Sequence, residues 1–300
     1  MTAVTVEPEQ VRADEAQPDR RVEVGRGWGR WLLFSVWAAF LVLPVTATVL
    51  YSLATVWRNE AFPDGYTLRW WTETLSEPRV ISSLVRSLLL AVLTVVVVAL
   101  IILPPLYWSY VRNQKIRAWM QLCALLPFAL PFVVLAYGIK NLAGITELTT
   151  QFESSSLLLV IGHVALAFPF FLWPVDGAMA SAGVRQLSEA AGASGAGPVA
   201  TLIRVVIPNI RTGLLTGSIL TFAVSFGEYS IARVITGSSF ETLPVWQVAA
   251  LQDTRGNPNG VAVMAVFTFV VMFAVSMLIA RATQGETIRL LPSVDVTRSE

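Results

Sequence analysis

The sequence predicts an all-α polytopic membrane protein with six transmembrane helices and with both the N and C termini in the cytoplasm. Three observations lead to this fold class. Hydrophobic residues make up 55% of the 300 residues and charged residues only 14%, whereas soluble domains average about 25% charged residues. Six apolar stretches reach the length of about 20 residues that a helix needs to cross a bilayer. Lys and Arg residues are concentrated in alternate connections between these stretches, which indicates an orientation.

The six predicted spans are, in chain order, Trp31–Trp57, Leu84–Tyr110, Ala118–Ile139, Ser156–Val175, Thr212–Thr236 and Gly260–Ala280. The third span contains Pro127 and Pro131, and the fourth contains Pro169 and Pro174. Proline is tolerated in a spanning helix where neighbouring groups satisfy the freed carbonyls. We therefore expect kinks in both spans, which suit either a transport pathway or simple packing of the bundle.

The orientation follows from the basic residues, which stay on the cytoplasmic side. The N-terminal tail, residues 110–117, residues 176–211 and the C-terminal tail, with Arg281 counted as part of that tail, together carry 14 Lys and Arg residues, and the opposite side carries five. Both termini are therefore expected in the cytoplasm. The resulting organisation is a polar, disordered tail over 1–30, a transmembrane domain over 31–281 with a long cytoplasmic loop at 176–211, and a second tail over 282–300.

The composition also excludes several classes of function. A net charge of +1 gives no general attraction to nucleic acid, and Cys123 is the sole cysteine, so multi-cysteine metal sites are excluded. The two lysines, Lys115 and Lys140, do not follow glycine as a phosphate-binding loop requires. We therefore expect no cofactor and no catalytic residue, and any ATP must be bound by another chain.

The long cytoplasmic loop has its own helix signals. Three glycines, Gly192, Gly195 and Gly197, predict a turn, and Pro198 suits the first turn of a following helix, which Pro208 is expected to end. Apolar stripes precede and follow the turn, at Val184, Leu187 and Ala191 and at Val199, Leu202, Ile203 and Val206. The loop is therefore predicted to form a short helix, a tight turn and a second short helix. It suits insertion into a groove on a partner, or the capping of the bundle without a partner.

The residues of this loop resemble the EAA loop of ABC importer permeases. Glu189, Ala190 and Ala191 are followed after three residues by Gly195, and after nine more by the sequence Val-Val-Ile-Pro ending at Pro208. The family pattern has Ile and Leu where this chain has Val205 and Ile207, which are mild apolar replacements. The resemblance extends from the segment beginning at Tyr66 to the last span.

This resemblance implies a bundle like that of importer permeases, in the bacterial inner membrane. It implies three kinds of protein partner beside membrane lipid: two ATPase subunits, a second homologous permease and an extracytoplasmic substrate-binding protein. Glu189 would make a polar or ionic contact with the ATPase, Ala190 and Ala191 would allow close approach, and Gly195 would form the turn. Nucleic acid is not an expected partner.

The predicted fifth span contains Glu228 and Tyr229 within the sequence Gly-Glu-Tyr. A carboxylate inside a span is costly and usually faces a cavity or a partner, so Glu228 is either a pathway residue or a group held by hydrogen bonds to a neighbouring helix. The tripeptide resembles permeases for polyamines, aminophosphonates, molybdate, sulfate and ferric iron, and the residues after it look most like those for polyamines and aminophosphonates. Importers of sugars or of inorganic ions are the alternative.

An intramembrane protease and a secondary carrier are two further classes with partial support in the sequence. Ser194 lies in Gly-Ala-Ser-Gly, which resembles the nucleophile motif of rhomboid proteases, but the sole histidine, His163, precedes it whereas the family order is the reverse. A secondary carrier is favoured by inverted repeats, and none is visible. His163 fits a buried interhelical hydrogen-bonding group better than a pathway residue. Gly213 and Gly217 form a helix-contact pattern. Leu243–Gln252 is expected to be either a short outer helix near a binding protein or a lid over the bundle.

Overall fold

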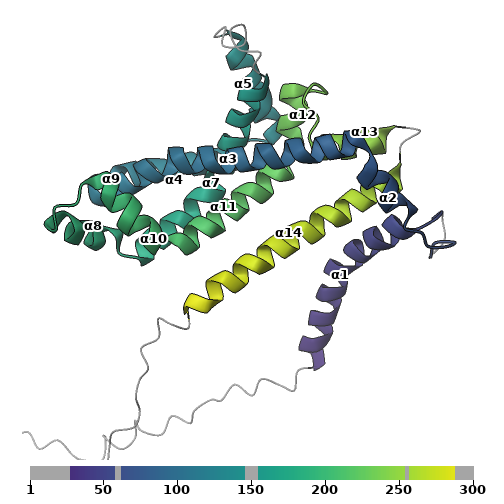
Figure 1. The fold of residues 1–300 in the computed structure, drawn as a ribbon, viewed down its shortest axis with the longest axis horizontal. Helices are drawn as coiled ribbons and strands as arrows, with labels where there is room; N and C mark the ends of the chain where they lie inside the picture. Colours follow the sequence, from purple (N-terminus) through teal and green to yellow (C-terminus); the bar gives the residue numbers. More distant parts are fainter. Residues whose placement is uncertain (1–27, 58–61, 146–154, 254–256, 288–300) are drawn as a thin grey trace, which may run out of the picture. The chain divides into compact units, whose positions relative to one another are not determined.

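The computed structural model describes residues 28–57, 62–145, 155–253 and 257–287. Apart from one isolated antiparallel bridge between Ala54 and Tyr66, the regular structure of these residues is helical (Figure 1). The larger helices are α1 (Trp28–Leu53), α3 (Pro78–Val111), α4 (Gln114–Ala129), α5 (Phe132–Ile145), α7 (Ser155–Ser181), α11 (Arg211–Phe226) and α14 (Pro258–Thr287). The shorter ones are α2 (Arg69–Ser76), α8 (Val184–Ala193), α9 (Pro198–Thr201), a π-helical turn η1 (Leu202–Val206), α10 (Ile207–Asn209), α12 (Ser230–Thr236) and α13 (Leu243–Gln252).

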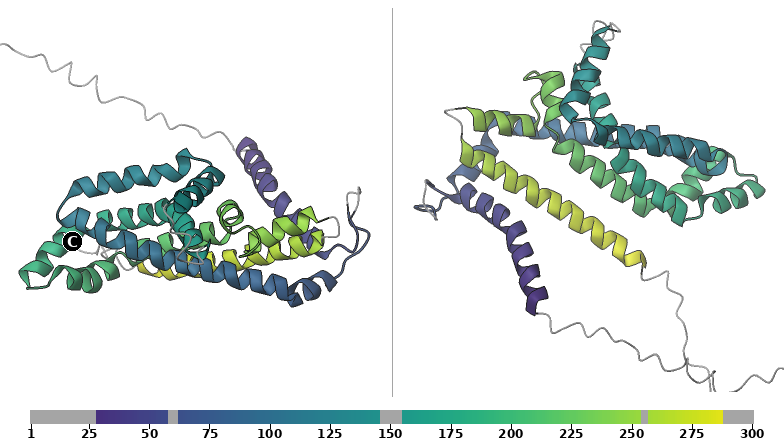
Figure 2. Two further views of the ribbon diagram at one scale, coloured as in Figure 1. Left: turned by 90° about the horizontal axis from the view of Figure 1, so that it is seen from above. Right: turned by 180° about the vertical axis from the view of Figure 1, so that it is seen from behind.

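The chain forms two compact units, residues 1–47 and 48–300. The described part of the first unit is the greater part of α1, whose apolar side chains are largely exposed, as suits a helix in lipid. In the second unit α3, α4, α7 and α11 pack side by side, as both views of Figure 2 show. Their shared core includes Ile102, Leu106 and Phe171, which are fully buried.

Helices α7 and α11 are in very close contact because two glycines of α11 face α7. A Cβ atom at Gly213 would lie 2.7 Å from the carbonyl oxygen of Pro174, and one at Gly217 would lie 3.1 Å from that of Phe171. The expected helix-contact pattern is therefore confirmed, and small residues here let the two backbones approach.

Among the described residues, three helices are long and apolar enough to cross a membrane, namely Trp28–Leu53, Pro78–Val111 and Ser156–Ser181, and there are up to five candidates if two bent pairs each count as one span. The predicted third span is one of these pairs, because α4 and α5 meet at 107°. Leu130 is extended there, with φ −122° and ψ 140°, since a residue before proline avoids the helical region. The prediction of one continuous third helix is therefore wrong, although Pro131 correctly marked the bend.

The helix ends also differ from the predicted boundaries. Helix α1 begins at Trp28, inside the predicted tail over 1–30, and α14 continues to Thr287, inside the predicted tail over 282–300. Residues 1–27 and 288–300, on which the rest of both tail predictions falls, lie outside the described residues. Helix α7 runs to Ser181, so the predicted loop over 176–211 has its first residues in a helix.

Candidate functional site

The segment that resembles an EAA loop, residues 184–209 and here called the EAA segment, forms two helical pieces joined by a turn (Figure 1). Gly183, with φ 60°, separates α8 from α7, and Gly195, with φ 83°, lies in the turn after α8. Both values are in the left-handed region, which glycine adopts without steric cost. Pro198 begins the second piece, where its missing N–H leaves no bond unmade. The predicted helix, turn and helix are thus present.

The EAA residues lie on an accessible part of α8. Glu189 and Arg185 form an ion pair at 3.0 Å between Arg185 Nε and Glu189 Oε1, and both side chains are 64% exposed. Such an exposed pair contributes little to stability, so Glu189 can exchange this partner for one on another protein. Ala190 is exposed and Ala191 half-buried, so no large side chain at these two positions obstructs close approach.

The second apolar stripe is only partly directed inward. Val206 is fully buried and Leu202 half-buried, whereas Val199 and Ile203 are 68% and 57% exposed. Val199 and Ile203 therefore belong to the predicted apolar stripe but are not part of the core. Exposed Val and Ile beside the turn give the EAA segment an apolar tip that nothing in the described chain covers, which suits a protein partner.

Pro208 does not end the second helical piece, which continues to Asn209. Proline lacks the N–H that would bond to the carbonyl of residue 204, and Leu202–Val206, which end two positions before Pro208, adopt a π-helical turn. Such turns mark local departures from the regular hydrogen-bond ladder. The chain then bends by 82° into α11, and the Asn209 side chain donates to the Val205 carbonyl at 2.7 Å.

Glu228 lies in a break of the predicted fifth span, between the end of α11 at Phe226 and the start of α12 at Ser230. The prediction of a continuous helix here is therefore wrong. Glu228 is buried, and its Oε2 accepts hydrogen bonds from the backbone N–H groups of Ile231 at 2.8 Å and Ala232 at 3.2 Å. A carboxylate at the N-terminus of a helix satisfies amides that have no partner within the helix. Its hydrogen bonds thus go to α12 rather than to a neighbouring helix.

The residues on either side of Glu228 contact other helices. Ser225 donates to Thr94 of α3 at 3.2 Å. Tyr229 is half-buried and packs against a cluster that includes Leu159 and Ile231. Glu228 and Tyr229 are therefore adjacent at a non-helical step inside the second unit.

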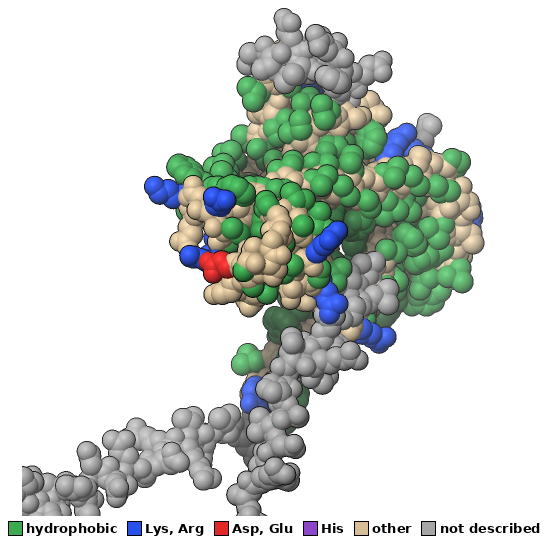
Figure 3. Space-filling model, turned by 60° about the vertical axis from the view of Figure 1, so that its left-hand side comes forward, with side chains coloured by type: hydrophobic (Ala, Val, Ile, Leu, Met, Phe, Trp, Pro, Cys, Tyr) green, Lys and Arg blue, Asp and Glu red, His purple; other side chains and the backbone are tan. Residues whose placement is uncertain are grey.

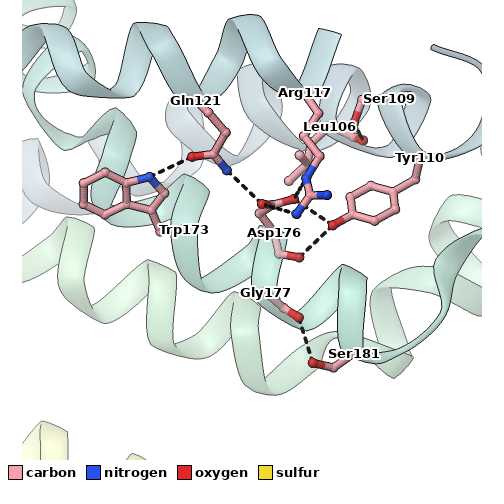
Figure 4. Close-up of polar contacts among 9 residues, drawn as sticks. All are labelled: Leu106, Ser109, Tyr110, Arg117, Gln121, Trp173, Asp176, Gly177 and Ser181. Atoms are coloured by element: carbon pink, nitrogen blue, oxygen red, sulfur yellow. Dashed lines mark hydrogen bonds and ion pairs between the residues drawn. The ribbon is translucent and has the colours of Figure 1, made fainter. Parts of the chain in front are cut away.

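The structure contains a polar cluster that sequence reasoning missed, centred on Asp176 of α7 (Figure 4). Arg117 of α4 donates to both carboxylate oxygens, Nε to Oδ1 at 2.7 Å and Nη2 to Oδ2 at 2.9 Å. Tyr110 of α3 donates to Oδ1 at 2.7 Å and Gln121 of α4 donates to Oδ2 at 2.8 Å. Trp173 completes the cluster with a bond to Gln121 at 3.0 Å. The one available signal was an acidic residue at the end of an apolar run.

The Asp176 cluster joins three helices just before the EAA segment begins. Asp176 is buried, and a buried carboxylate persists only where partners compensate its charge and fill its lone pairs. Five residues later α7 ends at Ser181, and Gly183 lies in the turn into α8. The base of the EAA segment is thus fixed to α3 and α4.

A second ion pair lies at the other end of α3. Arg79 donates to both carboxylate oxygens of Glu241, at 2.9 Å and 2.7 Å, and Ser87 accepts a hydrogen bond from the backbone N–H of Leu243 at 2.8 Å. These contacts hold the start of α13, the expected short helix over Leu243–Gln252, against α3. The side chains of Leu243 and Trp246 are buried between α3 and α14.

Ser194 and His163, the two residues that the protease alternative needs, are not hydrogen-bonded to each other. Ser194 is exposed and donates to the carbonyl of Ala190 at 3.3 Å. His163 is buried in α7, and its Nδ1 lies 2.8 Å from the carbonyl oxygen of Leu159 in the same helix, so its bond is within a helix and not between helices. Among the described residues no group of three His, Cys, Asp or Glu side chains could hold a metal ion.

Comparison with known proteins identifies the family. Residues 96–285, more than half of the chain, match the family described as binding-protein-dependent transport system inner membrane component. The chain is 32% identical over 178 residues to a putative ABC transporter permease protein of Streptomyces antibioticus, covering 58% of this chain and 74% of that protein. It is 30% identical over 200 residues to the molybdenum transport permease ModB of Azotobacter vinelandii, covering 62% and 88%.

A third relative is aligned over a longer stretch. The spermidine/putrescine transport permease PotC of Escherichia coli is 24% identical over 255 residues, covering 83% of this chain and 93% of its own. Membership of the family implies an ATPase, a substrate-binding protein and a second permease as partners, and it places ATP hydrolysis on a separate subunit. The chain belongs to the binding-protein-dependent transport family and is a multi-pass, non-catalytic permease subunit of an ABC importer in the inner membrane.

Proposed function

We propose that the EAA segment couples ATP-driven closure of two ATPase subunits to the transmembrane helices of this permease. The observation that carries the proposal is the exposed helix, turn and helix of residues 184–209, whose apolar tip has no cover within the described chain. In this role Glu189 makes a polar contact with the ATPase, and Ala190 and Ala191 allow the two surfaces to meet. Gly195 forms the turn between the two helical pieces, and Pro208 lies where the segment passes into α11.

The proposed assembly contains a second homologous permease and an extracytoplasmic binding protein, with both termini of this chain in the cytoplasm. Six spans result if α4 with α5 counts as one, α11 with α12 as another, and α14 as the last. In this arrangement Glu228 and Tyr229 lie along the pathway, at the break of the fifth span. Non-helical backbone at membrane depth is tolerated where it is buried in protein or lines a cavity, which supports a functional reason for the break.

A cross-linking experiment tests the contact with the ATPase. In a Cys123→Ser background, a single cysteine at Ala190 should cross-link to the co-expressed ATPase through a short bis-maleimide. The control places the cysteine at Leu251 in α13, which is 60% exposed and lies at the opposite end of the proposed topology. Cross-linking from Leu251 and not from Ala190 would contradict the proposal.

For the substrate we propose a small organic solute that carries an ammonium group, of the polyamine or aminophosphonate class. PotC, a spermidine and putrescine permease, aligns with 83% of this chain, and the Gly-Glu-Tyr sequence supports the same class. An inorganic oxyanion is the second candidate. ModB and the sulfate permease CysW of Escherichia coli are also relatives, and the Glu228 carboxylate is already bonded to the amides of α12.

Uptake in cells that lack this gene separates the two candidates. Labelled putrescine, 2-aminoethylphosphonate, molybdate and sulfate should be compared with and without the restored gene, at equal amounts of permease in the membrane. Restored uptake of either ammonium compound alone supports the first candidate. Restored uptake of molybdate or sulfate alone replaces it with the second.

A further inference from the structure

A hollow at the junction of α3, α4 and α8 is not explained by the transport function. It has an outer part of about 500 Å³ and an adjoining inner part of about 270 Å³, which share Tyr110, Gln114 and Arg185 among their lining residues. The outer wall adds Arg112 and Lys115, and the inner wall adds Arg117. We call these six residues and the space between them the basic groove.

The outer part of the basic groove carries positive charge that no carboxylate in its lining neutralises. None of the lining residues of either part is Asp or Glu. Arg117 is bonded to Asp176 and Arg185 to Glu189, whereas Arg112 and Lys115 have no ion-pair partner within the described ranges. Two cations without a carboxylate partner and the amide of Gln114 line the same part of the groove, and together they form a site for an anion with several oxygen atoms.

The groove lies at a membrane edge in the proposed topology. The Arg112 guanidinium is 5.5 Å from the centre of the Trp108 ring, and Trp108 itself is 44% exposed near the end of α3. Trp119, on α4, is 68% exposed. Tryptophan gathers at the level of lipid headgroups, so these two side chains place the mouth of the groove where headgroup phosphates are found.

The inner part of the groove is less polar than its mouth. Met179 and Val184 line it and are otherwise fully buried, and Arg117 there is already neutralised by Asp176. A free inorganic anion gains nothing from such a wall. A phosphate attached to glycerol can place its charged oxygens between Arg112 and Lys115 and its less polar part further in.

We propose that the basic groove binds the phosphate of an anionic phospholipid such as phosphatidylglycerol. Basic pockets at the cytoplasmic ends of transmembrane helices recognise lipid headgroups in this way. The site adjoins α8 through Arg185, so bound lipid would contact the base of the EAA segment. The proposal rests on the proposed orientation of the permease, but it requires no contact with the ATPase.

Quenching of Trp108 fluorescence tests the proposal. The full chain is placed in phosphatidylcholine vesicles that contain increasing fractions of spin-labelled phosphatidylglycerol or identically labelled phosphatidylcholine. The Trp108 contribution is the difference between each protein and its Trp108→Phe counterpart. For the parent chain we expect half-maximal quenching at a labelled-lipid fraction about tenfold lower for phosphatidylglycerol than for phosphatidylcholine. For the double variant Arg112→Gln with Lys115→Gln we expect the two fractions to differ by no more than about twofold.

The matched control removes two other exposed arginines on the same predicted side, Arg30→Gln with Arg204→Gln, and should keep the full preference. An unchanged preference in the groove variant, or an equal loss in the control, overturns the proposal. Loss of the preference when millimolar inorganic phosphate is added also overturns it and assigns the groove to a free anion. None of these results depends on ATP hydrolysis, so each is distinguishable from failure of the coupling proposal.

Discussion

Glu228 shows how a single carboxylate can be kept in an apolar region. Its Oε2 accepts from two backbone amides of α12, and the residues that donate, Ile231 and Ala232, are fully buried. The amides at a helix start lack partners within the helix, so the carboxylate and the break in the fifth span stabilise each other. The same bonds explain how this carboxylate is accommodated without a lysine or arginine partner in the described part of the chain.

Replacement of Glu228 should therefore affect stability through these amides. Glu228→Ala leaves both amides buried without an acceptor, which should lower the free energy of unfolding by about 1–3 kcal/mol. Glu228→Gln keeps a carbonyl oxygen in place and should lose less. Equilibrium unfolding of the full chain in mixed micelles measures both variants. An alanine variant as stable as the parent, or a glutamine variant as weak as the alanine variant, contradicts this role.

At the scale of helices, the Asp176 cluster explains how the EAA segment can be attached firmly to the membrane domain. Arg117 and Gln121 come from α4, Tyr110 from α3 and Asp176 from α7. A force applied to α8 therefore reaches three helices within a few residues of Gly183. At the other end of α3, the Arg79–Glu241 pair fixes α13. Helix α3 thus bears a bidentate contact near its start and the Asp176 cluster near its end.

Asp176→Asn tests the first of these attachments. The variant keeps an oxygen acceptor but leaves the Arg117 guanidinium without its counter-charge, and we expect a loss of about 3 kcal/mol in the free energy of unfolding. The matched control is Glu73→Gln, which removes the carboxylate of the exposed Arg69–Glu73 pair within α2 and should cost less than about 1 kcal/mol. Equal losses in the two variants would show that the cluster is no stronger than a surface pair.

At the scale of the whole molecule, the proposed topology predicts the sides on which two loops lie. Reporter fusions after Glu153 and after Pro198 should be active on opposite sides of the membrane, because α7 crosses between them. The basis is the unequal division of Lys and Arg between the two sides. Paired alkaline phosphatase and green fluorescent protein fusions measure this. Activity on the same side for both positions would contradict the six-span arrangement.

The sequence was sufficient for features that depend on local composition. Apolar length predicted the all-α membrane fold. Gly213 and Gly217 predicted a close helix contact for α11, though not that its partner is α7, because the absence of a Cβ atom is itself the cause of that approach. The helix, turn and helix of the EAA segment followed from Gly195, which can adopt a positive φ, and from Pro198, which suits the first turn of a helix. Each of these predictions used residues close together in the chain.

The features that were missed depend on contacts between distant residues or on competing backbone bonds. Asp176 meets Arg117 only when α4 and α7 pack together, 59 positions apart in sequence. The break at Glu228 depends on a side chain that takes amide bonds from the backbone, which hydropathy does not register. Val199 and Ile203 match the apolar period but are exposed, since the partner proposed to cover them is another protein.

The coupling role of the EAA segment is tested most directly by Gly195→Val in the reconstituted complex with ATPase, second permease and binding protein. A Cβ atom at Gly195 would meet nothing within 4 Å, but φ is 83°, a conformation that β-branched residues avoid. The change therefore strains the turn without a clash.

The control is Gly177→Val in α7, where a Cβ atom also meets nothing within 4 Å and φ is not positive. We predict that both variants assemble, that Gly177→Val retains substrate-stimulated ATP hydrolysis, and that Gly195→Val loses about tenfold or more of it, the effect of about 1.4 kcal/mol. Full substrate-stimulated hydrolysis in an assembled Gly195→Val complex would contradict the coupling role.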